Sequence, residues 1–171
     1  MSQPAIAKDS VQVVLDLLRG GLEPGVFKEF YDGDPDLIPD FNLPCVIVEQ
    51  ATDLTTGAAY ATDDITDTVV IRVVFNKKDD WTAQLDPTNT TQSKLRRVID
   101  TRDAPTGEYL PNTIKGILRP QLYGARRIDG DMNVEYRPNI RPDQAGASYA
   151  TNEATVTVTL TSTVDVPPIE Q

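Results

Sequence analysis

The sequence predicts an α+β protein in which two or three helices pack on a mainly antiparallel β-sheet. Two stretches, 66–76 and 154–166, alternate apolar and polar residues as half-buried strands do. Two others, 10–19 and 87–102, repeat apolar residues at the helical period of about 3.6. Because helical segments interrupt the strands, and because the chain has 171 residues, we expect one domain that spans 1–171.

The first expected element is a helix at residues 10–19. Asp9 and Gln12 have the types and the spacing of an N-terminal capping box, in which each side chain binds the backbone of the other residue. Two glycines follow the segment and predict the end of the helix. The apolar face of this helix is formed by residues three or four positions apart: Val11, Val14, Leu15 and Leu18.

Three strands are expected to build the sheet. The first is a short buried strand at 44–50, in which we interpret Cys45 as a small core residue. The strand at 66–76 has one fully apolar face and a second face that we expect to be half covered. The long closing strand at 154–166 alternates apolar residues with a row of threonines. The core face of the 66–76 strand is formed by Val69, Ile71, Val73 and Phe75.

The segment between these strands predicts further elements. A helix is expected at 87–102, with Asp86 as its cap and Pro87 in its first turn. Residues 112–122 predict a second, shorter helix. Asp129-Gly130 is a two-residue sequence typical of a β-hairpin turn.

Three long loops are expected at about 22–43, 51–66 and 137–150. All three are rich in turn residues. The first also carries aromatic and aliphatic side chains, which indicate that it is pinned to the body of the protein. The second is expected to be an extended hairpin tip or a flexible loop.

The composition argues against most enzyme chemistry. The chain has no histidine, which removes the usual general base, the usual zinc ligand and every Ser-His or Cys-His arrangement. Asp32, Asp34 and Asp36 begin like a calcium loop, but Leu37 and Leu43 occupy the positions of its glycine and its glutamate. We therefore expect no catalytic residue, no metal and no cofactor. No apolar run approaches the ~18 residues of a membrane span, so we expect no membrane partner.

Charge is distributed unevenly along the chain. Residues 1–67 hold 13 acidic and 3 basic residues, a net charge of −10, whereas residues 93–141 hold 10 basic and 6 acidic residues, a net charge of +4. One interpretation is a solvated acidic surface. The other is that the acidic part of one copy meets the basic part of its neighbour.

The stretch VVIRVVFNKKDDW, residues 69–81, joins a strand to four charges and the only tryptophan of the chain. We interpret its end as a contact loop, because one aromatic ring buries a large area at an interface. The alternative is that Trp81 completes the core of the monomer beside the second helix. With the arginines of the basic part, the candidate interface residues are Lys77, Lys78, Asp79, Asp80, Trp81, Arg96, Arg97, Arg137 and Arg141.

The order of these elements resembles one family of viral structural proteins. The amphipathic DSVQVVLDLLR, the buried LPCVIVEQ and the strand DTVVIRVVFNKKDDW occur in that order. They are followed by the helical TTQSKLRRVID and the closing TVTVTLTST. In this pattern, which covers most of the chain, the sequence resembles the tail terminator, or tail completion, proteins of long-tailed, lambda-like phages.

The resemblance implies a structural role rather than catalysis. A tail terminator is a small protomer that forms a ring, expected to be a hexamer, on the head-proximal end of the tail tube. There it stops polymerisation of the tail tube protein and offers a joining surface to the head-tail connector protein. DNA would pass through the ring without specific binding. The expected location is the virion tail, after assembly in the host cytoplasm.

Two other classes of function remain open from the sequence. A neck, head-closure or adaptor ring protein of the same virion would share the size and the charge of a tail terminator. A carboxylate-dependent enzyme or a generic binding module is the alternative outside virion structure. The enzyme would need a cleft in which carboxylates of raised pKa converge, whereas a ring protein needs none.

Overall fold

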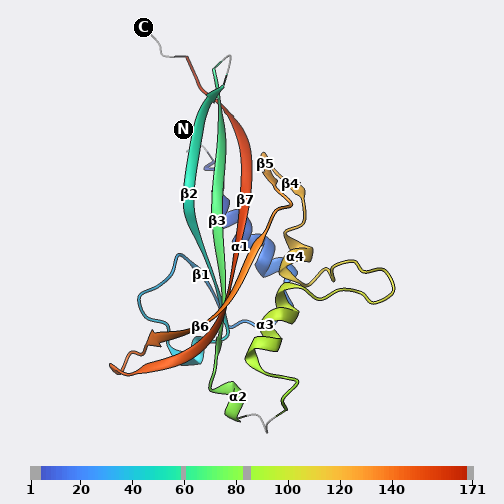
Figure 1. Cartoon of the computed structure of the whole chain (residues 1–171). Helices are drawn as coiled ribbons and strands as arrows, with labels where there is room; N and C mark the ends of the chain where they lie inside the picture. Colours follow the sequence, from blue (N-terminus) through green and yellow to red (C-terminus); the bar gives the residue numbers. More distant parts are fainter. Residues whose placement is uncertain (1–4, 59–60, 83–85, 169–171) are drawn as a thin grey trace.

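A computed structural model describes residues 5–58, 61–82 and 86–168, with the side chains of residues 81 and 82 excepted. Among these residues one seven-stranded sheet and several helices form a single domain, which confirms the predicted α+β class (Figure 1). The strands are β1 (Glu29–Asp32), β2 (Cys45–Ala58), β3 (Thr62–Asn76), β4 (Gln121–Tyr123), β5 (Arg126–Ile128), β6 (Asn133–Pro142) and β7 (Ser148–Asp165).

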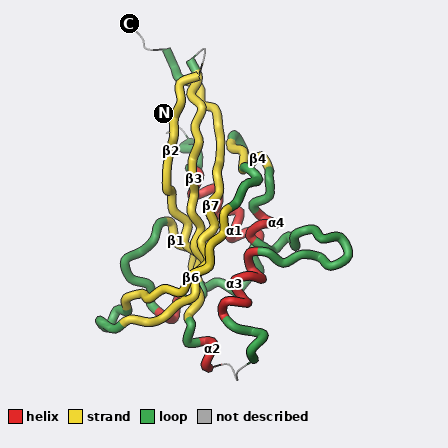
Figure 2. Tube along the Cα trace, viewed as in Figure 1, coloured by secondary structure: helices red, strands yellow, loops and turns green. Residues whose placement is uncertain are grey.

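The strands follow the order β1-β2-β3-β7-β5-β4 across the sheet (Figure 2). β1 pairs with β2 in parallel, and every other pairing is antiparallel. β6 also pairs with β7, at residues 148–157, while β5 pairs with β7 at residues 160–161. β5 and β6 therefore lie one after the other along the same side of β7.

The helices are α1 (Ser10–Gly21), α2 (Asp79–Thr82), α3 (Thr91–Ile99) and α4 (Ile114–Ile117), and a 3-10 turn covers Asp40–Asn42. The predicted capping box of α1 is present: the Asp9 carboxylate accepts from the Gln12 amide at 2.8 Å, and the Gln12 side chain accepts from the Asp9 amide at 3.1 Å. The helix runs through both glycines to Gly21, two residues further than predicted, because neither glycine has a left-handed backbone.

The main core lies between the helices and one face of the sheet. The apolar face of α1 packs there, as do Leu95 and Ile99 of α3 and Ile114 of α4. β3 contributes the core face that was predicted for the 66–76 strand. All four residues of this face are buried: Val69, Ile71, Val73 and Phe75.

A second, smaller core covers part of the opposite face. Ile38 and Leu43, from the connection between β1 and β2, pack on Cys45, Ile47 and Val74. Tyr149 donates from its hydroxyl to the Ile38 carbonyl at 2.7 Å. The predicted pinning of the 22–43 connection is thus confirmed, and so is the buried position of Cys45, where burial raises the pKa of the thiol to about 12.

Of the two alternatives predicted for 51–66, the extended hairpin is confirmed and the flexible loop is wrong. β2 continues to Ala58 and β3 begins at Thr62, so most of the segment is a long hairpin paired from Thr52↔Thr68 to Ala58↔Thr62. The sequence showed no apolar alternation there because both faces of these strands are solvent-accessible. Without a buried face, a strand loses the pattern by which it is recognised.

The loop predicted at 137–150 is also mostly strand. β6 reaches Pro142 and β7 starts at Ser148, which leaves a turn at 143–147. Pro138 and Pro142 are tolerated because β6 is paired on one side only, to β7, among the described residues.

The segment between α3 and β6 departs furthest from prediction. α3 begins at Thr91, with Thr90 as its cap, rather than at Pro87, and the predicted helix at 112–122 is the single turn α4 followed by β4. Asp129-Gly130 is not a hairpin turn, because it joins the two strands that follow each other along β7. The hairpin is instead at Gly124, which has φ +61° and connects the paired residues Tyr123 and Arg126.

Asp100 joins α3 to α4 and gives the fold a testable acid response. Its carboxylate accepts from Arg102 at 3.0 Å and from Lys115 at 2.8 Å, and the hydrogen bond from Arg102 is the main cause that holds its pKa below the ordinary value. A carboxyl of lowered pKa stabilises the fold above its unfolded pKa of about 4, and this contribution is lost as the pH falls through the folded value. Asp100→Asn should therefore cost about 1 kcal/mol at pH 7, and the difference from wild type should vanish near pH 2. Urea unfolding of both proteins across this range measures it, and a difference that persists at low pH would contradict it.

Candidate interaction surfaces

Three strands extend beyond the helices as a projecting arm, formed by residues 51–58 of β2, 62–66 of β3 and 161–165 of β7 (Figure 1). None of the residues of the arm is buried, and all those of the β2 segment are exposed. Leu54, on β2, is 61% exposed although it is a large apolar residue. The arm therefore has no buried side chain and presents both faces for contact.

The arm is acidic. Residues 49–67 contain five acidic residues and no lysine or arginine. Asp67, at the base of the arm, is buried, and its carboxylate accepts hydrogen bonds from the Ser10 hydroxyl and, at 3.0 Å, from Gln50. Asp53, Asp63 and Asp64 remain on the projecting part.

The β4–β5 hairpin lies on the other side of the sheet and is basic. Residues 119–127 contain three arginines and no acidic residue. Arg126 is held within the chain, because it donates to the Ser10 hydroxyl at 3.0 Å and to the Lys8 carbonyl at 2.6 Å. Arg119 and Arg127 are exposed, beside Leu122, which is 75% exposed. This surface was not predicted from the sequence, because residues 112–122 were expected to be a helix, whereas β4 begins at Gln121.

Arg141, a predicted contact residue, is instead buried within the chain. It binds Glu153 on β7 through two hydrogen bonds of 2.5 and 3.1 Å, and Asp34 at 3.0 Å. Burial disfavours its charge, but the hydrogen bonds and charges of Glu153 and Asp34 prevail and raise the pKa of Arg141. It is therefore not free to contact a neighbouring copy.

The same ion-pair network extends across the sheet. Arg72 on β3 binds the second oxygen of Asp34 at 2.8 Å and Glu49 on β2 at 2.8 Å. Asp34 thus bridges Arg72 and Arg141 and ties the loop after β1 to β3 and β6. This explains the Asp-rich turn that begins like a calcium loop: its central carboxylate serves an internal ion-pair network.

The predicted contact segment after β3 is a turn and the short helix α2. The Lys77 amide still pairs with the Ala150 carbonyl, at 3.0 Å. Asp80 accepts from the Thr91 amide at 2.6 Å and from its hydroxyl at 2.9 Å, so it fixes the first turn of α3. Lys78 is exposed and Asp79 is half-buried. The side chain of Trp81 lies outside the described part of the structure, so both of its interpretations stay open.

The remaining predicted arginines are on separate elements. Arg96 and Arg97 lie on the exposed side of α3, and Arg97 donates to the Thr88 carbonyl at 3.0 Å and to Asn89 at 3.2 Å. Arg137, on β6, is exposed and paired with Glu135 at 2.9 Å. The eight predicted residues whose side chains are described thus lie just after β3, on α2, on α3 and on β6.

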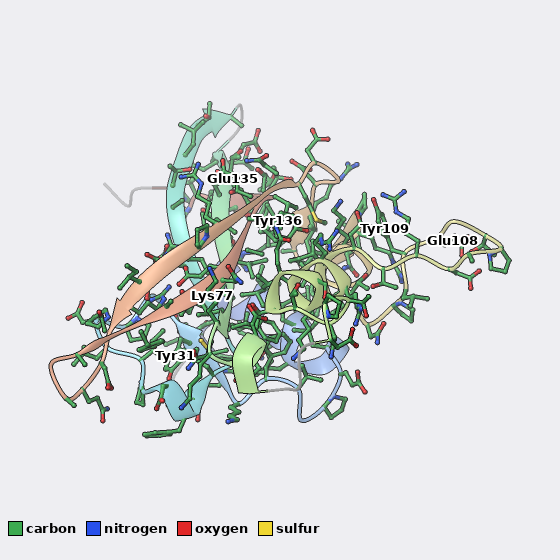
Figure 3. The ribbon with its side chains drawn as sticks, turned by 60° about the horizontal axis from the view of Figure 1, so that its bottom comes forward. Tyr31, Lys77, Glu108, Tyr109, Glu135 and Tyr136 are labelled. Atoms are coloured by element: carbon green, nitrogen blue, oxygen red, sulfur yellow. The ribbon has the colours of Figure 1, made fainter. Side chains whose placement is uncertain are left out.

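A projecting loop connects α3 to α4 and carries Glu108 and Tyr109 (Figure 3). Tyr109 is bridged to Arg102 in a short antiparallel contact, and the guanidinium of Arg102 lies 5.0 Å from the centre of its ring. The ammonium of Lys115 lies 5.6 Å from the same ring. The base of the loop is therefore fixed by two cation–π contacts.

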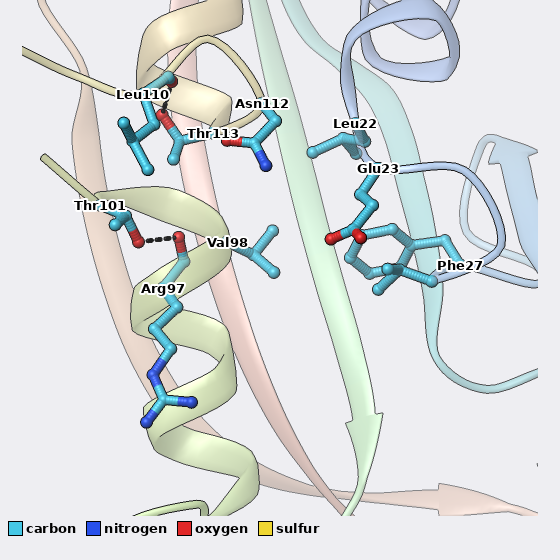
Figure 4. A pocket seen from close by; sticks show the side chains of 10 residues that line it. Leu22, Glu23, Phe27, Arg97, Val98, Thr101, Leu110, Asn112 and Thr113 are labelled. Carbon is cyan, nitrogen blue, oxygen red and sulfur yellow. Dashed lines mark hydrogen bonds between the residues drawn. The ribbon is translucent and has the colours of Figure 1, made fainter. Parts of the chain in front are cut away.

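A cavity of about 250 Å³ lies between the end of α1 and α3 (Figure 4). Two of the hydroxyls at its wall are already used in helix ends: Thr101 donates to the Arg97 carbonyl at 2.6 Å, and Thr113 to the Leu110 carbonyl at 2.8 Å. The other lining residues are Glu23, Arg97, Asn112 and five apolar residues: Leu22, Val26, Phe27, Val98 and Leu110.

The described residues form neither a metal-ligand cluster nor a membrane-spanning helix. Within 5–58, 61–82 and 86–168 there is no group of three or more Cys, Asp or Glu side chains placed to hold a metal ion. Over the same ranges, no helix has the length and apolar character to cross a membrane.

Comparison with known proteins places the chain in no family. No protein-family model matches it, and no curated protein sequence matches it.

Proposed function

We propose that this chain is a structural virion protein that assembles into a ring on the head-proximal end of a phage tail tube. In that position it stops polymerisation of the tube protein and provides the surface to which the head connector joins. DNA crosses the ring without specific binding. The sequence pattern described above is the basis for the family, and the surfaces of the fold are the basis for assembly.

The observation that carries the proposal is the projecting arm. A strand gains stability from burial of at least one face, yet residues 51–58 of β2 are exposed on both faces. Long, exposed edge strands are templates for pairing with another chain. An arm of this kind therefore favours a protein that works by contact with other protein chains.

Charge supports the same conclusion. β2, which carries Glu49 and Asp53, and the basic β4–β5 hairpin form opposite edges of the sheet of one protomer, so these two edges do not contact each other within the chain. Between copies they are complementary, and such head-to-tail contacts close into rings when the rotation permits.

Removal of the coding sequence from the phage genome that carries it tests this function. We expect tails of irregular, excessive length that carry no heads, because nothing stops tube growth. Negative-stain electron microscopy of the lysate measures both features, and addition of the purified chain during assembly should restore a single tail length.

The other outcomes separate the alternatives. Tails of normal length beside unattached, DNA-filled heads would favour a neck or head-closure role instead. Normal particles of normal infectivity would exclude a virion role of either kind and favour a binding module or an enzyme.

A further inference from the structure

Five residues form one continuous row across the sheet from edge to edge. Leu122 of β4 pairs with Arg127 of β5, which pairs with Thr161 of β7. Thr161 pairs with Thr66 of β3, which pairs with Leu54 of β2. Directly opposed residues on neighbouring strands point to the same face of a sheet. The row thus begins and ends in an exposed leucine, 61% exposed at Leu54 and 75% exposed at Leu122.

Both ends of the row are open sheet edges. β1 pairs with β2 only as far as Val48, so in the described structure residues 49–58 of β2 have β3 as their one neighbour. On the opposite side, the only described strand that pairs with β4 is β5. Each edge therefore presents backbone donors and acceptors to another strand, at the same level of the sheet as an exposed leucine.

The two edges also differ in charge. Residues 49–58 of β2 carry two acidic residues, Glu49 and Asp53, and no basic one, whereas residues 119–127, around β4, carry three arginines and no acidic residue. Two β2 edges, or two β4 edges, would repel each other, whereas a β2 edge and a β4 edge attract. The partner that fits each edge is thus the opposite edge of a second copy.

We propose that the β2 edge of one protomer docks on the β4 edge of the next, with Leu54 against Leu122, so that one sheet continues from copy to copy. Successive antiparallel pairings from β2 through β3, β7 and β5 leave β4 running in the same direction as β2. A ring whose axis runs along the strands keeps their direction, so the contact is a parallel strand pair. The proposal rests on the ring assembly of the proposed function and names its contact.

Cysteine cross-linking tests the contact. Within one chain, Leu54 and Leu122 are separated by four strand spacings, about 19 Å, which no disulfide spans. Between docked edges they are about 5 Å apart, within disulfide range. The native Cys45 is buried, so it stays out of the exchange.

Leu54→Cys/Leu122→Cys protein, oxidised gently at high concentration, should form a ladder of disulfide-linked oligomers that ends at the size of the ring. An equimolar mixture of the two single variants should give dimers only. Leu37→Cys, at another exposed leucine away from both edges, is the matched control and should not link to Leu54→Cys. Non-reducing gels and intact mass measure all three.

Assembly without cross-links provides the second measurement. Leu122→Glu should leave the monomer folded and lower the oligomer fraction in light scattering at least tenfold. Ile140→Glu, at a residue that is 70% exposed on β6 and outside the row, should leave that fraction unchanged.

Three results would overturn the docked edges. The first is disulfide-linked dimers from Leu54→Cys alone, which would indicate a two-fold β2–β2 contact. The second is the absence of any disulfide between positions 54 and 122 in the double variant. The third is a normal oligomer fraction for Leu122→Glu. If one of them occurs while the protein still restores tail length, the ring contact lies elsewhere and the proposed function stands. A cross-linked ladder from a protein that never limits tail length would leave the docked edges standing and reject the function.

Discussion

Glu153→Ala should destabilise the protein by about 3–5 kcal/mol, because it removes the main partner of a buried arginine. Glu153 is buried and accepts four hydrogen bonds: two from Arg141, one from Thr151 at 2.9 Å and one from Asn139 at 3.2 Å. Without it, Arg141 keeps its charge and is paired with Asp34 alone. Urea unfolding monitored by circular dichroism measures the loss.

The neighbouring exposed ion pair provides the control. Glu135 pairs with Arg137 on β6 at a similar distance, 2.9 Å, but both side chains are solvent-accessible. Glu135→Ala should cost less than about 1 kcal/mol. In the double variant Arg141→Met/Glu153→Leu, apolar side chains replace the pair, so part of the lost stability should return. Equal costs for Glu153→Ala and Glu135→Ala would show that burial does not strengthen the pair.

Gly116→Ala should cost about 3 kcal/mol or more, because the added methyl group has no space. A β-carbon at Gly116 would lie 2.1 Å from the Leu110 carbonyl oxygen and 3.0 Å from the Thr113 hydroxyl oxygen. The nearer atom belongs to the backbone, so no change of rotamer relieves the contact. The strain falls on the turn that starts α4, where Thr113 caps the helix and binds the same carbonyl at 2.8 Å.

The same substitution at Gly20 should have the opposite sign. Gly20 lies in α1, and a β-carbon there meets no atom within 4 Å. Gly20→Ala should stabilise the protein by about 0.5–1 kcal/mol, because alanine loses less backbone freedom on folding. Thermal unfolding of the two variants measures both effects. Destabilisation by Gly20→Ala would contradict the open environment of that residue.

Some features of this fold were decided by short-range sequence. The start of α1 depends on two residues three positions apart, Asp9 and Gln12, and the capping box formed as predicted. The core face of β3 follows from strict alternation, which admits only one way to bury Val69 and Ile71 together. Cys45 is buried because its neighbours are apolar. In each case the signal and the structure it specifies lie within a few residues.

Other features were decided by the tertiary structure alone. Nothing near Arg141 in the sequence distinguishes it from Arg137, yet one is buried by Glu153 and Asp34 and the other is exposed, since the partner Asp34 is 107 residues away. Residues 51–58 and 62–66 of the arm are strands because β7 extends beside β3, although these residues carry no apolar period.

The row from Leu54 to Leu122 belongs to this second class. It depends on the register of four strand pairings. In one of these, β5 pairs with β7 beyond the end of β6, although Asp129-Gly130 between β5 and β6 predicted a hairpin. Local sequence determines which segments extend or coil, because backbone propensity and capping act over a few residues. Which edges remain open, and which side chains meet across them, depends on long-range pairing that only the folded chain decides.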